Sequence, residues 1–436
     1  MAYFLQNAFA QTERKETMNP FELKSKSVGS AFKSWSALCP KPYNKNEVDP
    51  YTKTRIILMN GTEFEAVWFG HQYQRRCPDN DLRRELALLR RVEQQQQKII
   101  AALRPLDETI LETTISYEQL AVDLTAGMAQ DEPNKEVKAA LDFALLEDFD
   151  HLYRYADLLE MESGVRAEQL VGHYTEIMPG RPTVSEHRHP YDNVRRWIDC
   201  KKAHPLTKLH VGIITAAEQQ TMNYYMNTSA ICCSDTQRRL FQEIGLIEEQ
   251  HVTQYGSLMD TTATFLESLL QHEYTECYLY YSCFKDETDK DVKAIWEMHF
   301  EQEVSHLHKA AELLKRYEKK EWQEVIPVGD FPKLLTLHEN KKYIRGILAG
   351  TVQNTSLRED YLDVASLDSG ADFFRFQKKL NDPVEKVPTH SFIQHYMDEK
   401  GSDYRFEEKP HPVAALRSRT QDNTAAGRQP GGEECC

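Results

Sequence analysis

One arrangement of ionisable residues occurs three times in the sequence and constrains the fold more than any other feature. A Glu is followed at a fixed interval by a second acid, Glu or Asp, and three positions after that acid by a His, which gives the pattern E-x29-[DE]-x-x-H. Residues three apart share one face of a helix, with side chains roughly 5–6 Å apart, so the acid and the His can bind one metal ion. The three copies are Glu118, Asp148 and His151; Glu218, Glu248 and His251; and Glu273, Glu303 and His306.

The midpoint between the two acids of each copy falls in a stretch with the composition of a turn. The midpoints are Pro133, Cys233 and Thr288, in D-E-P-N, C-C-S-D and K-D-E-T-D. Each copy is therefore predicted to be a helical hairpin. Its Glu and its acid/His pair would lie at equal heights, roughly 18 Å from the turn at 1.5 Å per residue. Facing hairpins of this kind could place their ligands in one layer.

Apolar and aromatic residues flank the repeated acids, which predicts that the acids lie on or beside the buried stripe of each helix. A buried carboxylate is costly unless it is paired or bound to a metal, so we expect at least one set to bind metal. A purely structural repeat is the competing interpretation, because Glu and His are common on solvated helix faces. In the first copy Glu147 competes with Asp148 as the ligand. The flanking residues are Leu145, Leu146, Phe149, Leu152, Ile244, Ile247, Trp296 and Phe300.

A Glu on one helix and Glu-x-x-His on its hairpin partner, used twice, resembles the di-iron carboxylate four-helix bundle of the ferritin-like superfamily, with rubrerythrins closest in character. The resemblance covers roughly residues 108–318. It implies two iron or manganese ions held by four carboxylates and two His, and such oxygen-rich sites suit Fe(II) or Mn(II). The chain departs from the family in having three half-sites, Asp148 for the usual Glu, and no C-x-x-C pair.

The lengths of the connections predict which hairpins pair. Two antiparallel hairpins of one bundle need about 35 residues between the His of the first and the Glu of the second. The connection from His151 to Glu218 is well above this length, whereas the connection from His251 to Glu273 is well below it. The first two copies are therefore predicted to form one site within a chain. The third is predicted to be scaffold or to complete a second site across a homodimer.

The predicted fold class is all-α. We expect a ferritin-like four-helix bundle extended by a third helical hairpin, with irregular flanks. One strand-like run, Thr54–Met59, ends at the turn signal Asn60-Gly61 in the N-terminal flank. The expected regions are an irregular arm over residues 1–80, the bundle over 81–320 with a crossover connection at 165–205, a wrapping segment over 321–410, and a disordered tail over 411–436.

Composition narrows the classes of function and partner. A net charge of −15 argues against general nucleic-acid binding. No run of about 18 apolar residues is present, so no membrane span is expected. The N-terminal stretch fits a signal peptide poorly, and the nine Cys are an odd number. These two observations predict a cytoplasmic protein with reduced thiols. Cys435-Cys436 fits the end of a disordered tail better than a lipidation or metal handle.

The pattern favours a di-iron oxidoreductase that activates O2 or peroxide. An iron-handling ferroxidase, storage or carrier protein is the first alternative, although the long flanks fit a storage shell poorly. A metal-free helical scaffold is the second. No G-x-G-x-x-G fingerprint is present, so the substrate and electron donor stay unnamed, and a redox partner protein stays an open option.

Overall fold

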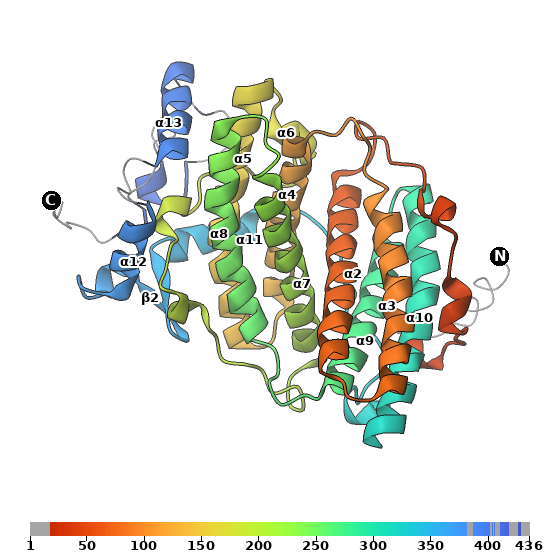
Figure 1. Cartoon of the computed structure of the whole chain (residues 1–436). Coiled ribbons are helices and arrows are strands. Elements are labelled where there is room, and N and C mark those ends of the chain that lie inside the picture. Colours follow the sequence, from red (N-terminus) through yellow and green to blue (C-terminus); the bar gives the residue numbers. More distant parts are fainter. Residues whose placement is uncertain are drawn as a thin grey trace. The chain divides into compact units, whose positions relative to one another are not determined.

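The described part of the chain is all-α, as predicted, apart from one small sheet (Figure 1). The computed structural model describes residues 18–381, 387–401, 403, 405, 410–417 and 426–428. The sheet is an antiparallel hairpin of β1 (Asn354–Leu357) and β2 (Asp360–Asp363). None of the described helices is long and apolar enough to cross a membrane.

The helices are divided between two compact units. Unit 1 consists of Met1–Pro105, Ile198–Ala216 and Asp260–Thr336. Unit 2 consists of Leu106–Trp197, Ala217–Met259 and Leu337–Cys436. Helix α7 (Pro205–Thr228) begins in unit 1 and ends in unit 2. This division corrects the expectation of a single bundle over residues 81–320.

Unit 1 is built on two helical hairpins. Helices α2 and α9 pack together, as do α3 and α10, so the hairpins face each other. Each helix begins at a side-chain cap: Asp49, Asp79, Thr264 and Asp289 accept hydrogen bonds from N–H groups of the first turn. The hairpins are α2 (Pro50–Arg76) with α3 (Asn80–Ala101), and α9 (Phe265–Asp286) with α10 (Lys290–Glu318). Short 3-10 turns flank them at Pro20–Glu22, Val28–Ala31, Trp35–Leu38 and Trp322–Glu324.

The prediction of an irregular arm over residues 1–80 is wrong for its second half. Thr54–Met59, predicted to be a strand, lies inside α2, where all six residues are buried. Asn60-Gly61 continues the same helix instead of ending it. The physical reason is that strand propensity is a weak preference. A capped start, with Pro50 in the first turn, and packing of α2 on α3 and α9 outweigh it.

Unit 2 contains the other pair of hairpins around a continuous apolar core. Thr109 and Glu112 form a capping box at the start of the first helix, and Gly164 ends the second with a φ of 71°. Tyr155, Tyr225 and other large side chains fill the core between the helices. The helices are α4 (Ile110–Asp131), α5 (Lys135–Ser163), the later part of α7, and α8 (Asp235–Ser257).

The predicted crossover connection, residues 165–205, contains only short helical elements, and Gly180 and Arg181 within it lie close against α5. A Cβ atom at Gly180 would lie 2.6 Å from the Leu146 carbonyl oxygen and 2.8 Å from the Asp150 nitrogen, so only Gly allows this approach. Arg181 N–H donates to the Leu146 carbonyl at 3.3 Å. The short elements of this connection are the helix α6 (Ala167–Leu170) and the 3-10 turns Thr183–Ser185 and Pro190–Asn193.

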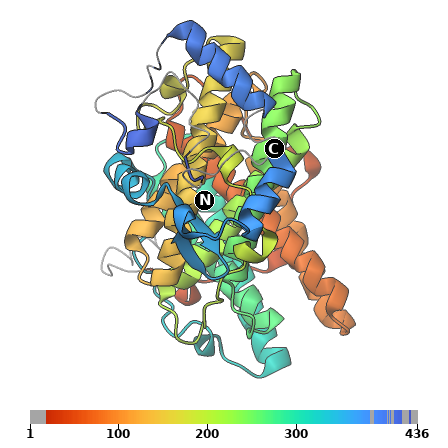
Figure 2. The ribbon, with the colours of Figure 1, turned by 90° about the vertical axis from the view of Figure 1, so that its left-hand side faces the viewer.

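The described helices after Leu337 pack on the hairpins of unit 2, where α11 contacts α5 and α13 contacts α8. Figure 2 shows these C-terminal elements in blue, facing the viewer. His411 and Leu416 are buried, so the predicted disordered tail is wrong for these residues. Residues 418–425 and 429–436, with Cys435-Cys436, lie outside the described residues. The elements are α11 (Lys341–Thr351), the turn Val364–Ser366, α12 (Asp372–Asn381), α13 (Pro388–Lys400) and the turn Ala414–Leu416.

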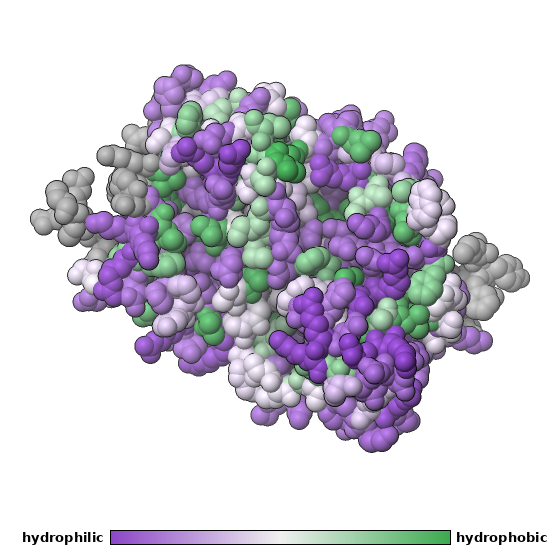
Figure 3. All heavy atoms as spheres, in the orientation of Figure 1, coloured by the Kyte–Doolittle hydropathy of each residue, from purple (hydrophilic) through white to green (hydrophobic). Residues whose placement is uncertain are grey.

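The surface drawn in Figure 3 is mostly hydrophilic, with hydrophobic residues scattered between polar ones. The apolar residues are instead concentrated inside each helical unit. Buried among them are clusters of carboxylates and imidazoles, which an apolar interior alone does not stabilise.

Candidate metal centres

Unit 2 brings together the six ligands predicted from the first two copies of the repeat. Each of the four helices contributes, and all six side chains are at most 1 % exposed. They form two groups whose potential ligand atoms lie within 4.8 Å of one another. Glu248 belongs to both groups. The groups are Asp148, Glu218, Glu248 and His251, and Glu118, His151 and Glu248.

The carboxylate of Glu248 lies between the two imidazoles. Nδ1 of His151 is 3.0 Å from one Glu248 oxygen, and Nδ1 of His251 is 3.1 Å from the other. The two rings are 6.1 Å apart, centroid to centroid. A carboxylate that faces two separate nitrogen ligands, one through each oxygen, is placed to bridge two ions.

The electrostatics of this cluster are unbalanced. Burial and neighbouring carboxylates hold the pKa values of Glu118 and Asp148 well above their usual range and raise the pKa of Glu218 to about 7. Burial opposes ionisation of Glu248 too, but hydrogen bonds with His151 and His251 lower its pKa to about 2. The cluster thus holds more carboxylates than its two imidazoles can neutralise.

Several oxygens in the layer have no hydrogen-bond donor within the described chain. Both oxygens of Asp148, both of Glu218 and one of Glu118 are in this position. A buried carboxylate without a donor loses its hydration with nothing in exchange. Four carboxylates and two imidazoles are a donor set that fits two divalent cations, which would supply the missing positive charge.

Glu147, the alternative to Asp148, lies outside both groups and orients a ligand. One oxygen of its carboxylate is hydrogen-bonded to Nε2 of His251, while Nδ1 of that ring faces Glu248. Its other oxygen accepts a hydrogen bond from Arg188, which is fully buried and comes from the 165–205 connection. Such partners set the tautomer and direction of a metal-binding imidazole. The structure therefore places Asp148, not Glu147, among the candidate ligands.

A tyrosine of α7 holds the Glu of α4. The hydroxyl of Tyr225 donates to Glu118. Tyr155 and Phe241 contact the Tyr225 ring, with centroids 5.3 and 5.5 Å away. These buried rings fix the Tyr225 hydroxyl and, through it, the Glu118 side chain.

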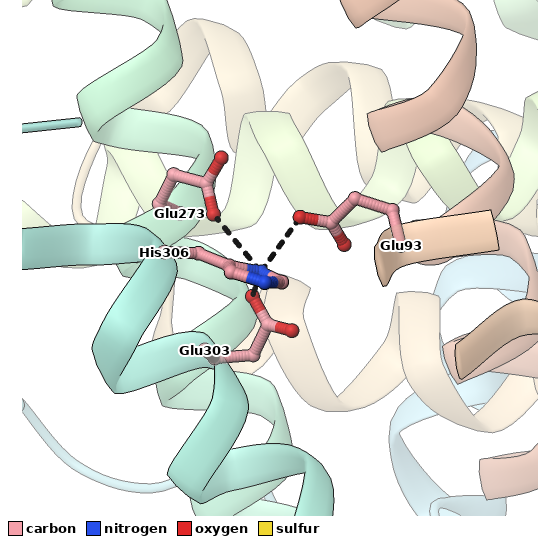
Figure 4. A group of neighbouring side chains, drawn as sticks. All are labelled: Glu93, Glu273, Glu303 and His306. Atoms are coloured by element: carbon pink, nitrogen blue, oxygen red, sulfur yellow. Dashed lines mark hydrogen bonds and ion pairs between the residues drawn. The ribbon is translucent and has the colours of Figure 1, made fainter. Parts of the chain in front are cut away.

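Unit 1 contains the third copy of the repeat in a separate cluster. Figure 4 shows Glu93, Glu273 and Glu303 converging on His306. Nδ1 of His306 is 2.7 Å from Glu93, 3.2 Å from Glu303 and 3.9 Å from Glu273. A second group, Glu63, Glu93 and Glu276, shares Glu93 with the first.

The third copy stays apart from the first two, as the short connection between His251 and Glu273 predicts. Its three residues do not join the ligands of the first two copies. Their partner is the α2–α3 hairpin of the same chain, which the sequence reasoning had assigned in part to an irregular arm. The role of the third copy as scaffold or in a homodimer stays a prediction.

A fourth copy of the repeat was missed because Gln replaces its His. Glu93 follows Glu63 at the same interval as in the other copies, and Gln96 occupies the position where those copies have a His. The midpoint between Glu63 and Glu93 is Pro78, which lies in the turn between α2 and α3. A search that allowed Gln as well as His at the last position would have found it.

The two units also have a tyrosine at equivalent positions. Tyr225 follows Glu218 at the same interval, seven positions, as Tyr280 follows Glu273. Each hydroxyl donates to the first Glu of the partner hairpin, Tyr225 to Glu118 and Tyr280 to Glu63.

No family model, curated protein or solved structure matches this chain. The geometry and chemistry of the two clusters are therefore the basis on which we infer function.

Proposed function

We propose that unit 2 is a ferritin-like bundle that binds two metal ions, iron foremost with manganese as the alternative, and activates O2 or peroxide. The observation that carries the proposal is the position of Glu248, whose two oxygens face Nδ1 of His151 and Nδ1 of His251. A single imidazole–carboxylate pair is common in helical cores. Two such pairs that share one carboxylate, surrounded by buried acids without donors, are not explained by packing.

The proposed ligands divide between the two positions. Glu118 and His151 would hold one ion, and Glu218 and His251 the other. Asp148 would join Glu218 and His251, and Glu248, which belongs to both groups, would serve both ions. An iron pair bound there supplies redox electrons and Lewis acidity for the reduction of O2 or peroxide.

The chain contributes orientation and exclusion of water. Glu147 and Arg188 fix the His251 ring from behind, and Tyr225 fixes Glu118. The ligands are buried, so small molecules such as O2 and peroxide fit the site better than a bulky substrate. The oxidised product would depend on which molecule approaches the ligand layer of unit 2.

The test compares neighbouring carboxylates on α8. Glu248→Gln removes the shared ligand, whereas Glu249→Gln changes an exposed side chain at the next position. After anaerobic loading with Fe(II), we expect Glu248→Gln to hold about two fewer ions per chain by elemental mass spectrometry. Glu249→Gln should match the wild type. Equal iron contents in both variants would refute the proposal.

Oxidation kinetics distinguish the enzyme from an iron-handling protein. The loaded wild type, mixed with O2 or peroxide in the presence of a reductant, should consume oxidant over many turnovers. Glu248→Gln should lose this activity. Oxidation of iron only in proportion to the iron added would instead indicate a ferroxidase or carrier.

A further inference from the structure

We propose that unit 1 holds a second metal site of different composition, in which one position is bound through oxygen atoms alone and prefers a hard divalent cation such as Mn2+. Its ligands would be Glu63, Glu93, Glu276 and the amide oxygen of Gln96. No residue of this site belongs to the cluster in unit 2, so the inference goes beyond the function proposed above and stands apart from it.

The first support is the convergence of buried oxygens at this position. Ligand atoms of Glu63, Glu93 and Glu276 lie within 4.8 Å of one another, and all three residues are at most 2 % exposed. They come from three different helices, α2, α3 and α9. Three buried carboxylates from separate elements do not meet through the periodicity of any one helix.

The second support is a set of buried oxygens with no donor. Neither oxygen of Glu276 has a hydrogen-bond donor among the described residues, although His272 Nε2 is 3.5 Å from one of them. The Gln96 amide group donates through Nε2 to Glu303, and its Oε1 is buried without a donor in the described chain. Gln96 thus has a side-chain oxygen without a donor, and it occupies the position of the repeat that is His in the other three copies.

The third support is the charge of the cluster. It contains the carboxylates of Glu63, Glu93, Glu273, Glu276 and Glu303. His306 is the imidazole that belongs to these groups, and His272 lies 3.5 Å from Glu276 outside them. No Lys or Arg in the described part of the chain pairs with any of the five. Buried carboxylates that lie close together must take up protons or bind cations, and two divalent cations would nearly balance these five.

The composition of each position predicts its preference for metal. Nitrogen ligands favour Fe2+ and Zn2+, whereas carboxylate and amide oxygens suit Mn2+ and Mg2+. In unit 1 His306 serves the position formed with Glu273 and Glu303, and the position of Glu63 and Glu276 has only oxygens. In unit 2 both positions have a His. The chain would therefore offer one oxygen-only position and three that include nitrogen.

The test uses the full chain with unit 2 silenced by Glu248→Gln. The metal-stripped protein is titrated with MnCl2, and free Mn2+ is followed by electron paramagnetic resonance. We expect Glu276→Gln to bind one Mn2+ fewer per chain. Glu312→Gln, on the exposed face of α10, is the matched control and should bind as many ions as its parent.

A gain-of-ligand variant tests the same position without removing a charge. Gln96→His restores the pattern of the other three copies and should raise binding of Zn2+ relative to Mn2+ at least tenfold in competition. Circular dichroism checks the fold of each variant. Equal Mn2+ binding by Glu276→Gln and Glu312→Gln, or an unchanged preference in Gln96→His, would overturn the proposal. Loss of ions in Glu248→Gln alone concerns unit 2 and leaves this result independent.

Discussion

Replacing Glu218 by Gln is expected to stabilise the metal-free protein and to weaken the metal-loaded one. Glu218 is 1 % exposed, and neither of its oxygens has a hydrogen-bond donor among the described residues. Its neighbours in the layer are Asp148, Glu248 and His251. Without metal the negative charge of Glu218 destabilises the fold, whereas with metal its carboxylate is a ligand. The substitution should therefore have opposite effects on the metal-free and the metal-loaded protein.

The size of the effect follows from the pKa of Glu218. Burial and the neighbouring Glu248 carboxylate raise this pKa from 4.5 to about 7. One pKa unit corresponds to about 1.4 kcal/mol, so at neutral pH the buried carboxylate destabilises the metal-free fold by about 3 kcal/mol. Removing this cost by Glu218→Gln corresponds to an increase of roughly 6–12 °C in the unfolding midpoint.

The assay is thermal unfolding at neutral pH with a chelator and then with Fe(II) under anaerobic conditions. Ions at a hundred times their Kd should stabilise the wild type by about 2.7 kcal/mol, and Glu218→Gln should lose most of that increase. Glu243→Gln is the matched control. Glu243 is a carboxylate on the same helix with 10 % of its side chain exposed, and it accepts hydrogen bonds from Thr389 at 2.6 Å and His390 at 2.9 Å.

The control should therefore be destabilised in both conditions by about 1–3 kcal/mol. The reasoning is refuted if Glu218→Gln lowers the unfolding midpoint of the chelated protein as Glu243→Gln does. That result would mean that the Glu218 carboxylate is satisfied within the protein and needs no ion.

Three further predictions concern what surrounds the ligands. Gly180→Ala should lower the unfolding free energy by about 1–3 kcal/mol or more in denaturant titrations, since the new methyl group would contact the backbone of α5, which carries two proposed ligands. Burial lowers the pKa of His187 to about 4, so its contribution to stability is present above pH 6.5 and is lost as the pH falls towards 4. Between pH 6.5 and pH 4, the unfolding free energy should fall by about 3 kcal/mol more in the wild type than in His187→Gln. Arg405→Met should cost about 3–5 kcal/mol at pH 8, because it leaves the buried carboxylate of Asp157 without its guanidinium partner.

The pairing of the first two hairpins was predictable because it depends on the reach of the chain. The connection from His251 to Glu273 is too short to span a bundle and return, whatever its sequence, whereas the connection from His151 to Glu218 is long enough. The structure accordingly groups Asp148 with Glu218 and His151 with Glu248. That argument needed no knowledge of side-chain packing.

The α2–α3 half-site escaped prediction for two physical reasons. An amide oxygen can replace an imidazole nitrogen as a donor to a metal, so a pattern that requires His excludes Gln96. In addition, the β-branched residues of Thr54–Met59 favour strands in isolation, and only packing against α3 and α9 shows that this segment is helical.

The orienting residues of unit 2 were not predictable from spacing. Arg188 lies in a connection without helical periodicity, and its contact with Glu147 depends on the path of the backbone past α5. The choice between Glu147 and Asp148 follows from that contact. Spacing predicted the ligand layer, whereas the groups that hold its imidazoles depend on tertiary structure.

The order of segments along the chain has a consequence for how the protein folds during synthesis. The four ligand helices of unit 2 lie within residues 106–259, whereas unit 1 needs helices from both sides of that stretch. Local contacts form faster than contacts between distant segments, and domains fold as units while the chain emerges. Helices α4, α5 and α8, with the later part of α7, can therefore assemble while α2 and α3 wait with Glu63 and Glu93 unmatched. Unit 1 is completed only when α9 and α10 have been made, and unit 2 receives its last segment, which begins at Leu337, later still.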